Sequence, residues 1–185
     1  VGDQEIVVTV TTGIATFPEN GMDARDLLRN ADLALAKAKT QGRNAILSFE
    51  EGIGAGLSEF FFLEKKLFSA LKNKEYIVHY QPCCDLLTKN CLSAEALIAW
   101  NNPDLGVVSP ARFIPSLENT GMIIDVGKWV LETACGQIRD WQTRKRALPV
   151  SVNLSFAQFR HKDLVRMVSD AVDGFKLDPR HLTLE

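Results

Sequence analysis

The sequence lacks the long apolar run that a membrane span needs, because no stretch approaches the roughly 18 consecutive apolar residues required. No signal-peptide pattern opens the printed chain. The sequence also lacks a long block of residues with the same sign of charge. The formal net charge is −2 at pH 7, and the basic run 144–146 is too short to indicate nucleic-acid binding. We therefore expect no membrane segment in this chain and no nucleic acid polymer as its partner.

Cysteine is scarce, with four residues, and none has the CxxC spacing of zinc or redox motifs. Cys83 and Cys84 are adjacent, and Cys91 and Cys135 stand apart from them. This usage is typical of buried reduced thiols in a cytosolic protein. It argues against a disulfide framework or a zinc site.

What the chain does have is globular composition and one glycine-rich break. Its 185 residues suffice for one domain or parts of two, and 46% of them are hydrophobic while 24% are charged. Segment 50–56 holds three glycines in seven residues. We expect a linker at residues 51–57 between a first part, 1–50, and a second part, 58–185.

The first part is predicted to contain two strands around one helix. Residues 6–14 and 44–49 are strand-like, and Asp23 is placed to cap a helix that ends near Gly42. One stripe of that helix is formed by Leu27, Ala31, Leu35 and Ala38. The first part is therefore expected to be a piece of an α/β domain.

The second part alternates strand-like and helical segments, which predicts an α/β architecture. The strand-like segments are 76–84, 91–100, 149–154 and 181–185, and the helical ones are 110–117, 124–141 and 163–175. A short loop joins the first two strands, so they are expected to form an antiparallel hairpin. The later strands are separated by helices and are expected to be parallel. The chain stops within an apparent strand, which suggests a segment of a longer domain.

Three oxygen-bearing side chains stand at equivalent places on three of these strands. Glu95, Asn153 and Glu185 each lie on the strand face opposite the flanking apolar residues. A charged side chain is costly to bury without a partner. A shared site for a hard cation is the simplest interpretation, and polar groups satisfied by nearby backbone are the alternative.

The second part resembles the EAL family, the cyclic di-GMP phosphodiesterase domain of bacteria. The resemblance covers residues 58–185. Its motifs occur in family order: Tyr80-Gln-Pro82, Glu95-Ala-Leu97, Val108-Ser-Pro110, Val152-Asn-Leu-Ser155 and Leu182-Thr-Leu-Glu185. A lone Glu-Ala-Leu would mean little, but this ordered series is specific.

The first part resembles the C-terminal end of a GGDEF domain, the diguanylate cyclase family. Thr12–Ala15, Leu28–Asp32 and Ala38–Asn44 carry this match. The signature GGDEF turn is not in the printed sequence, so we expect no synthesis of cyclic di-GMP by it. The whole chain would then be the remnant of an α/β nucleotidyl-cyclase-like domain followed by part of an EAL domain.

The EAL resemblance implies about half of a modified (β/α)8 TIM-type barrel whose first strand is antiparallel. It also implies hydrolysis of cyclic di-GMP to linear pGpG by a water that a divalent metal activates. Glu95, Asn153 and Glu185 match the family's metal ligands, with Glu95 also counted as catalytic. Their oxygen donors favour Mg²⁺ or Mn²⁺ over zinc.

The resemblance also implies substrate contacts and a setting. Gln81 and Leu97 match positions that contact the dinucleotide, although Leu97 could equally be a core residue. Phe113 and Pro115 are expected either to wall a guanine pocket or to anchor a loop. Family members often form homodimers, and their nucleotide substrate implies a cytoplasmic location.

One departure bears on catalysis. Active members usually carry an arginine that holds a substrate phosphate at the position of Ala99. Three functions therefore remain open: a phosphodiesterase, a catalytically inactive cyclic di-GMP receptor, and a protein-interaction module without nucleotide binding. The chain by itself is not expected to hydrolyse the substrate, because about 110 residues is roughly half of what a barrel of about 250 residues needs.

Overall fold

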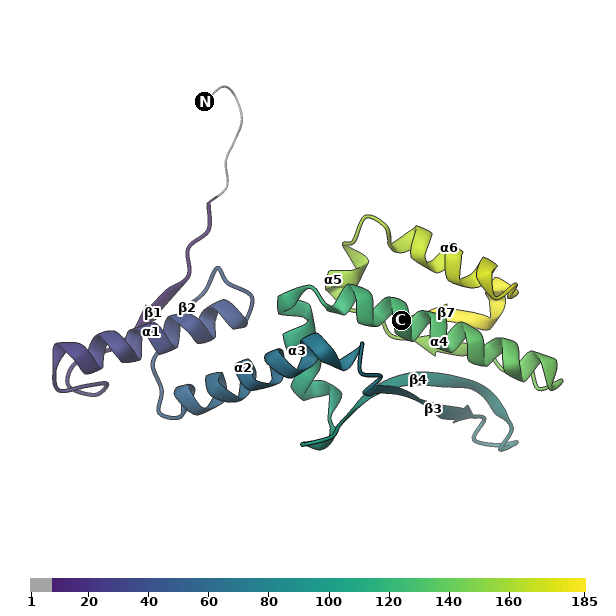
Figure 1. Cartoon of the computed structure of the whole chain (residues 1–185), viewed down its shortest axis with the longest axis horizontal. Helices are drawn as coiled ribbons and strands as arrows, with labels where there is room; N and C mark the ends of the chain where they lie inside the picture. Colours follow the sequence, from purple (N-terminus) through teal and green to yellow (C-terminus); the bar gives the residue numbers. More distant parts are fainter. Residues whose placement is uncertain (1–7) are drawn as a thin grey trace, which may run out of the picture. The chain divides into compact units, whose positions relative to one another are not determined.

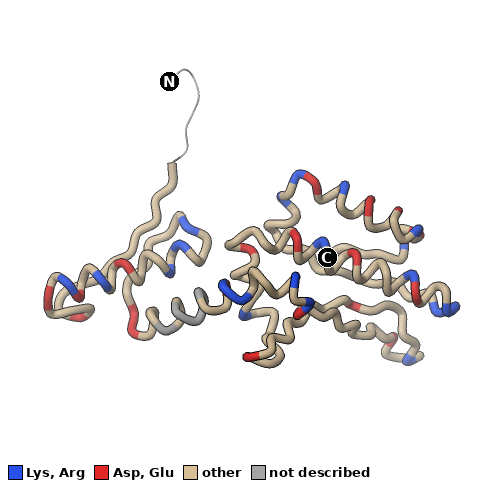
Figure 2. The backbone as a smooth tube through the Cα atoms, viewed as in Figure 1, with Lys and Arg blue, Asp and Glu red and all other residues tan. Residues whose placement is uncertain are grey.

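The computed structural model describes residues 8–185, and the side chains of all of these except residues 55 and 58–61. The chain divides into two compact units, Val1–Lys65 and Lys66–Glu185 (Figure 1). Lys and Arg are interspersed with Asp and Glu along both units (Figure 2). In the described part of the chain, no helix is long and apolar enough to cross a membrane.

The first unit packs one helix against two short parallel strands. Strand β1 (Thr12–Ile14) pairs with β2 (Ile46–Ser48), and helix α1 (Ala24–Thr40) lies between them in sequence. The Asp23 side chain accepts a hydrogen bond from the Asp26 backbone N–H at 2.8 Å, which confirms the expected helix start. Gly13 allows close packing, because a Cβ there would lie 2.2 Å from the Ala31 carbonyl oxygen.

The glycine-rich break differs from expectation. Helix α2 (Ile53–Ala70) begins inside the segment predicted to be a linker. Ile53 and Leu57 are only 4% and 5% exposed. Burial of these two side chains offsets the helix-propensity cost of about 1 kcal/mol for each glycine in this turn of α2. The glycine content of the segment therefore did not indicate that part of it is helical.

The second unit has a five-stranded sheet with helices against it. In chain order it contains β3 (Tyr76–Cys84), β4 (Cys91–Asn102), β5 (Gly106–Val108), α3 (Pro110–Thr120), α4 (Ile123–Thr143), β6 (Val150–Val152), α5 (Phe156–Phe159), α6 (Leu164–Gly174), a 3-10 turn at Pro179–His181, and β7 (Leu182–Leu184). The sheet order is β3-β4-β6-β7, and β5 pairs with β4.

Strand directions agree with the sequence analysis. β3 and β4 are antiparallel, whereas β4, β6 and β7 run parallel to one another. β5 and α5 were not anticipated from the sequence. An antiparallel first strand followed by parallel strands and helices is the arrangement of an opened half-barrel, so the predicted fold class is confirmed.

The core of this unit lies between the sheet and its helices. Ala96, Val150 and Val152 of the sheet pack against α4 and α6, and Ile138 and Ala134 of α4 are completely buried. Because side chains alternate along a strand, Glu95 and its neighbours at odd positions of β4 face the other way. One face of the sheet therefore holds the unit together, and the opposite face is left to carry polar groups.

The prediction of buried thiols was wrong for three cysteines. Cys135 on α4 is fully buried, but Cys83, Cys84 and Cys91 are exposed. These three lie at the end of the β3–β4 hairpin, next to the turn that joins the two strands. Position in the hairpin therefore decided their exposure.

Candidate functional site

The pairing of strands brings four of the predicted site residues to one face. Glu95 lies opposite Gln81 in the β3–β4 ladder and beside Ser151 in the β4–β6 ladder. Ser151 in turn lies beside Thr183 of β7. Laterally paired residues share a face, and so do residues two apart on a strand. Asn153 and Glu185 therefore continue the face that carries Glu95 and Gln81.

The closest contact on this face joins two strands. The Asn153 side-chain Nδ2 donates a hydrogen bond to Glu95 Oε1 at 2.7 Å, although the residues are 58 positions apart in sequence. Asn153 is exposed and Glu95 is half-buried. A hydrogen bond to a carboxylate is stronger than one between neutral groups, so this contact fixes where β6 ends relative to β4.

Glu185 joins the site through its backbone. Its N–H donates to the Val152 oxygen at 3.0 Å, and its own carbonyl accepts from the Leu154 N–H at 2.7 Å. This pair of hydrogen bonds places Glu185 beside Asn153 at the carboxyl ends of β7 and β6. The Glu185 side chain is exposed at that edge.

The donor set is two carboxylates and one amide on three adjacent strands. Oxygen ligands of this kind suit Mg²⁺ or Mn²⁺, so the chemistry of these residues fits the implied metal. Among the described residues, no group of three or more His, Cys, Asp or Glu is arranged to hold a metal ion. A metal here would therefore depend on the amide oxygen of Asn153 as well as on the two carboxylates.

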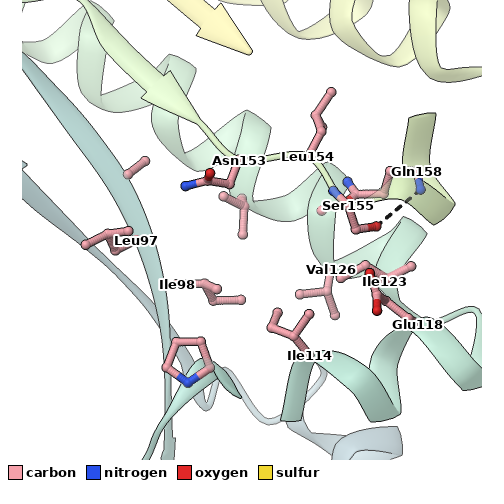
Figure 3. Close-up of a pocket in the computed structure, with 14 residues that line it drawn as sticks. Leu97, Ile98, Ile114, Glu118, Ile123, Val126, Asn153, Leu154, Ser155 and Gln158 are labelled. Carbon is pink, nitrogen blue, oxygen red and sulfur yellow. Dashed lines mark hydrogen bonds between the residues drawn. The ribbon is translucent and has the colours of Figure 1, made fainter. Parts of the chain in front are cut away.

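Leu97 and Asn153 border a hollow of about 340 Å³ (Figure 3). Its walls are mostly apolar and come from β4, α3 and α4, including Ile98, Ile114 and Val126. Gln81 does not line this hollow; its exposed side chain lies on β3, opposite Glu95. The site thus combines a polar face with an adjoining apolar recess.

Ser155 and Gln158 also line that recess and were not predicted as site residues. Ser155 caps the short helix α5, because its hydroxyl accepts from the Gln158 N–H at 3.2 Å (Figure 3). In return, Gln158 Oε1 accepts from the Ser155 N–H at 3.1 Å. The spacing Ser-x-x-Gln is the capping-box pattern, so the sequence did contain the signal. This cap fixes the chain directly after Asn153.

Phe113 and Pro115 are placed differently from the other predicted residues. Phe113 is fully buried, with its ring centroid 5.9 Å from that of Tyr76 and 5.8 Å from that of Trp100. Tyr76 and Trp100 are directly paired, on the strand face opposite Glu95. These contacts indicate that Phe113 packs in the core. Pro115 is exposed on α3.

Contacts of Tyr80 with α4 orient β3 so that Gln81 lies on the face of the site. The Tyr80 ring meets Trp141 edge-on at 5.3 Å, and its hydroxyl donates to the Thr133 oxygen at 3.4 Å. Burial, and then the nearby Cys135, raise the pKa of Tyr80 to about 12, so it stays neutral at physiological pH. With Tyr80 packed against α4, its neighbour Gln81 must point to the opposite face.

Comparison with known proteins identifies both parts of the chain. The EAL domain family matches residues 64–185, and the family "Diguanylate cyclase, GGDEF domain" matches residues 1–45. The chain is 37% identical over 186 residues to the bifunctional diguanylate cyclase/cyclic di-GMP phosphodiesterase MucR of Pseudomonas aeruginosa, covering 100% of this chain and 27% of MucR. It is 33% identical over 158 residues to the cyclic di-GMP phosphodiesterase PdeR of Escherichia coli, covering 85% of this chain and 24% of PdeR.

A solved structure agrees. The MucR phosphodiesterase in complex with c-di-GMP superposes with a TM-score of 0.65 at 37% identity, covering 66% of this chain and 50% of that one. The chain spans about a quarter of the length of the curated relatives it matches. Since the EAL match covers more than half of the chain, the chain belongs to the EAL domain family, preceded by the end of a GGDEF domain.

Proposed function

We propose that the EAL part of this chain, residues 58–185, contributes to a cyclic di-GMP phosphodiesterase that releases linear pGpG. The observation that supports this most directly is the Asn153–Glu95 hydrogen bond of 2.7 Å, with Glu185 in register beside Asn153. Relatives named as cyclic di-GMP phosphodiesterases support the substrate. The nucleotide substrate also supports a cytoplasmic location. We further propose that the protein forms a homodimer, as EAL family members often do.

In this proposal Glu95, Asn153 and Glu185 hold Mg²⁺ or Mn²⁺ through their side-chain oxygens. A bound divalent cation supplies an activated water and neutralises charge on the phosphate. Asn153 has an ordering role as well, because its amide fixes one oxygen of Glu95. Residues 51–57, although partly helical, remain our proposed junction between the GGDEF and EAL parts.

Substrate contacts follow from position on the same face. Gln81, opposite Glu95, offers both a donor and an acceptor to the dinucleotide. Leu97 offers apolar surface where the polar face meets the recess. Pro115 is an exposed position that a base could reach, whereas Phe113 would act by supporting α3 from the core.

The test is chromatography of cyclic di-GMP incubated with the full-length protein and Mg²⁺ or Mn²⁺. Glu95→Ala should lower pGpG formation by at least about 100-fold, since even residues behind metal ligands are worth 10–100-fold. Glu132→Ala is the matched control, because Glu132 is an exposed glutamate paired only loosely with Lys128 at 3.9 Å. Equal activity of the two variants would contradict the proposal.

A second candidate is a receptor that binds cyclic di-GMP without cleaving it. The observation that favours it is Ala99, which lies on the face of Glu95, is only 7% exposed and carries an uncharged methyl side chain. Binding of cyclic di-GMP to the full-length protein, measured by calorimetry with Ca²⁺, would be retained while no pGpG appears with Mg²⁺ or Mn²⁺. Formation of pGpG that Glu95→Ala abolishes would rule this candidate out.

A further inference from the structure

Three exposed thiols gather at the end of the β3–β4 hairpin, outside the candidate metal site. Cys84 and Cys91 are direct partners in the β3–β4 ladder. The register shifts between Cys83 and Cys84, so that Cys83 pairs with Ser93 instead. Neither the proposed metal site nor its substrate contacts use these thiols.

The backbone hydrogen bonds show which kind of pair Cys84 and Cys91 form. The Asp85 N–H donates to the Asn90 oxygen at 2.9 Å. The hydrogen-bonded position is therefore the Asp85–Asn90 pair, directly next to the cysteines. Cys84 and Cys91 therefore occupy a non-hydrogen-bonded position, where Cα atoms are about 4.5 Å apart and side chains are closest. That separation lies within the roughly 4.4–6.8 Å that disulfides span.

The turn between the two cysteines is well ordered by its own hydrogen bonds. Asp85 Oδ1 accepts from the N–H groups of Leu87 and Thr88, at 3.1 and 2.6 Å, and from the Thr88 hydroxyl at 2.8 Å. These bonds hold the pKa of Asp85 below its usual value. A preordered turn keeps Cys84 and Cys91 paired across the two strands without a covalent link.

The surroundings of Cys91 leave it accessible. It borders a hollow of about 240 Å³ together with Trp141 and Arg146, at the end of α4. Burial and the neighbouring thiols of Cys84 and Cys83 raise the pKa of Cys91, as expected for sulfurs packed together. Cys91 lies four positions before Glu95, about 13 Å along the strand, so the pair lies outside the candidate metal site.

We propose that Cys84 and Cys91 are a redox modification site: a dithiol that small-molecule disulfides such as oxidised glutathione convert reversibly to a cross-strand disulfide. One protein thiolate attacks the small disulfide, forming a mixed disulfide and expelling one thiolate. The second protein thiolate attacks the protein sulfur of the mixed disulfide, forming the Cys84–Cys91 bond and expelling the other thiolate. The two thiol protons end on the two released small thiols, so two protein thiols are oxidised and one disulfide is reduced.

The bond would tie together the ends of the strands that carry Gln81 and Glu95. The Cys84–Cys91 disulfide is favoured by geometry over a disulfide that involves Cys83 or Cys135. Cys83 and Cys84 are neighbours on one strand and point to opposite faces, and Cys135 is fully buried. The inference does not depend on whether the protein hydrolyses cyclic di-GMP.

Peptide mapping tests this directly on the full chain. Trypsin cleaves after Lys89, between the two cysteines, and yields peptides 75–89 and 90–112. After exposure to oxidised glutathione and blocking of free thiols, the monomer should contain these two peptides linked, and a reductant should release them. Cys83→Ser should keep the link, and Cys84→Ser and Cys91→Ser should lose it.

Three results would overturn the proposal. The first is a monomer whose peptides 75–89 and 90–112 stay separate, carrying only glutathione adducts or a bond within 75–89. The second is a link found only in covalent dimers. The third is a link that survives in Cys84→Ser, which would assign it to Cys83. Peptide 129–139, with the buried Cys135, is an internal control that should remain a free thiol.

Discussion

At the scale of single residues, Glu95 and Ala99 bear on different parts of the proposed function. Glu95 has a partner across the sheet, Asn153, and offers a carboxylate to a cation. Ala99 lies four residues further along the same strand face and offers only a methyl group. In the proposed function Glu95 supports catalysis, whereas Ala99 lacks the charge that the EAL resemblance implies at that place.

Ala99→Arg tests the missing charge. If Arg restores a charge-assisted hydrogen bond to a phosphate, worth about 1.5–3 kcal/mol, the affinity for cyclic di-GMP or kcat/KM should rise about 10- to 100-fold. Ala99→Met is the control for added bulk, which costs stability without adding charge. Both variants are compared by titration calorimetry and by pGpG release. Identical results for the two would mean that charge at this position is irrelevant.

Glu75 is a second residue with consequences, this time for stability. It accepts hydrogen bonds from Trp100 Nε1 at 2.8 Å, Asn102 Nδ2 at 2.9 Å and Asn73 Nδ2 at 3.0 Å. Burial alone would raise the pKa of Glu75, but these donors and nearby Lys66 outweigh it and hold the pKa below its ordinary value of 4.5. The ionised form is therefore favoured by folding.

The stability that Glu75 provides should depend on pH. Because its folded pKa is depressed, its contribution is complete above the unfolded pKa and disappears as pH falls through the folded pKa. Glu75→Gln should lower the free energy of unfolding by about 1–2 kcal/mol at neutral pH. The difference from the unsubstituted protein should shrink below pH 4.5. Urea unfolding followed by Trp fluorescence measures it, and Glu132→Gln should show little difference at any pH.

At the scale of elements, the contact between α4 and α5 positions the chain that follows Asn153. Gly127 of α4 lies under Gln158, and a Cβ at Gly127 would come within 1.9 Å of Gln158 Nε2. Gln158 is 5% exposed and is held by the Ser155 cap, so its side chain cannot easily move away. A glycine is needed here because the two elements approach so closely.

Gly127→Ala should therefore destabilise the protein, by about 1–3 kcal/mol as for other overpacked sites. Gly174→Ala is the control, since a Cβ there meets no atom within 4 Å and alanine is the better helix former. Thermal unfolding compares the variants. Adding Gln158→Ala should recover much of the loss from Gly127→Ala, and failure to do so would place the strain elsewhere.

At the scale of the whole molecule, β3 and β7 are the edge strands of the EAL sheet in this 185-residue chain. Within the described residues, β3 pairs only with β4, and β7 pairs only with β6. Unpaired N–H and C=O groups at such edges favour pairing with another chain. The 185-residue chain should therefore self-associate, and a sheet in this open form should not release pGpG by itself.

Self-association can be tested at the β7 edge. Leu184 is 38% exposed, and Leu184→Lys should lower the associated fraction because charge at an edge opposes strand pairing. Val165→Lys is the matched control, since Val165 is 78% exposed on α6, away from the edge. Sedimentation velocity over a range of concentrations gives the associated fraction. An equal decrease in both variants would point to general apolar association.

The sequence by itself determined the order of motifs, the alternation of strands and helices, and the faces of Glu95, Asn153 and Glu185. These depend on local periodicity and capping, which neighbouring residues set. Only the tertiary structure decided the Asn153–Glu95 contact, the burial of Phe113, the helix over residues 53–57 and the exposure of Cys84 and Cys91. Those outcomes depend on strand register and on which surface a helix covers, and both arise from packing between residues far apart in the chain.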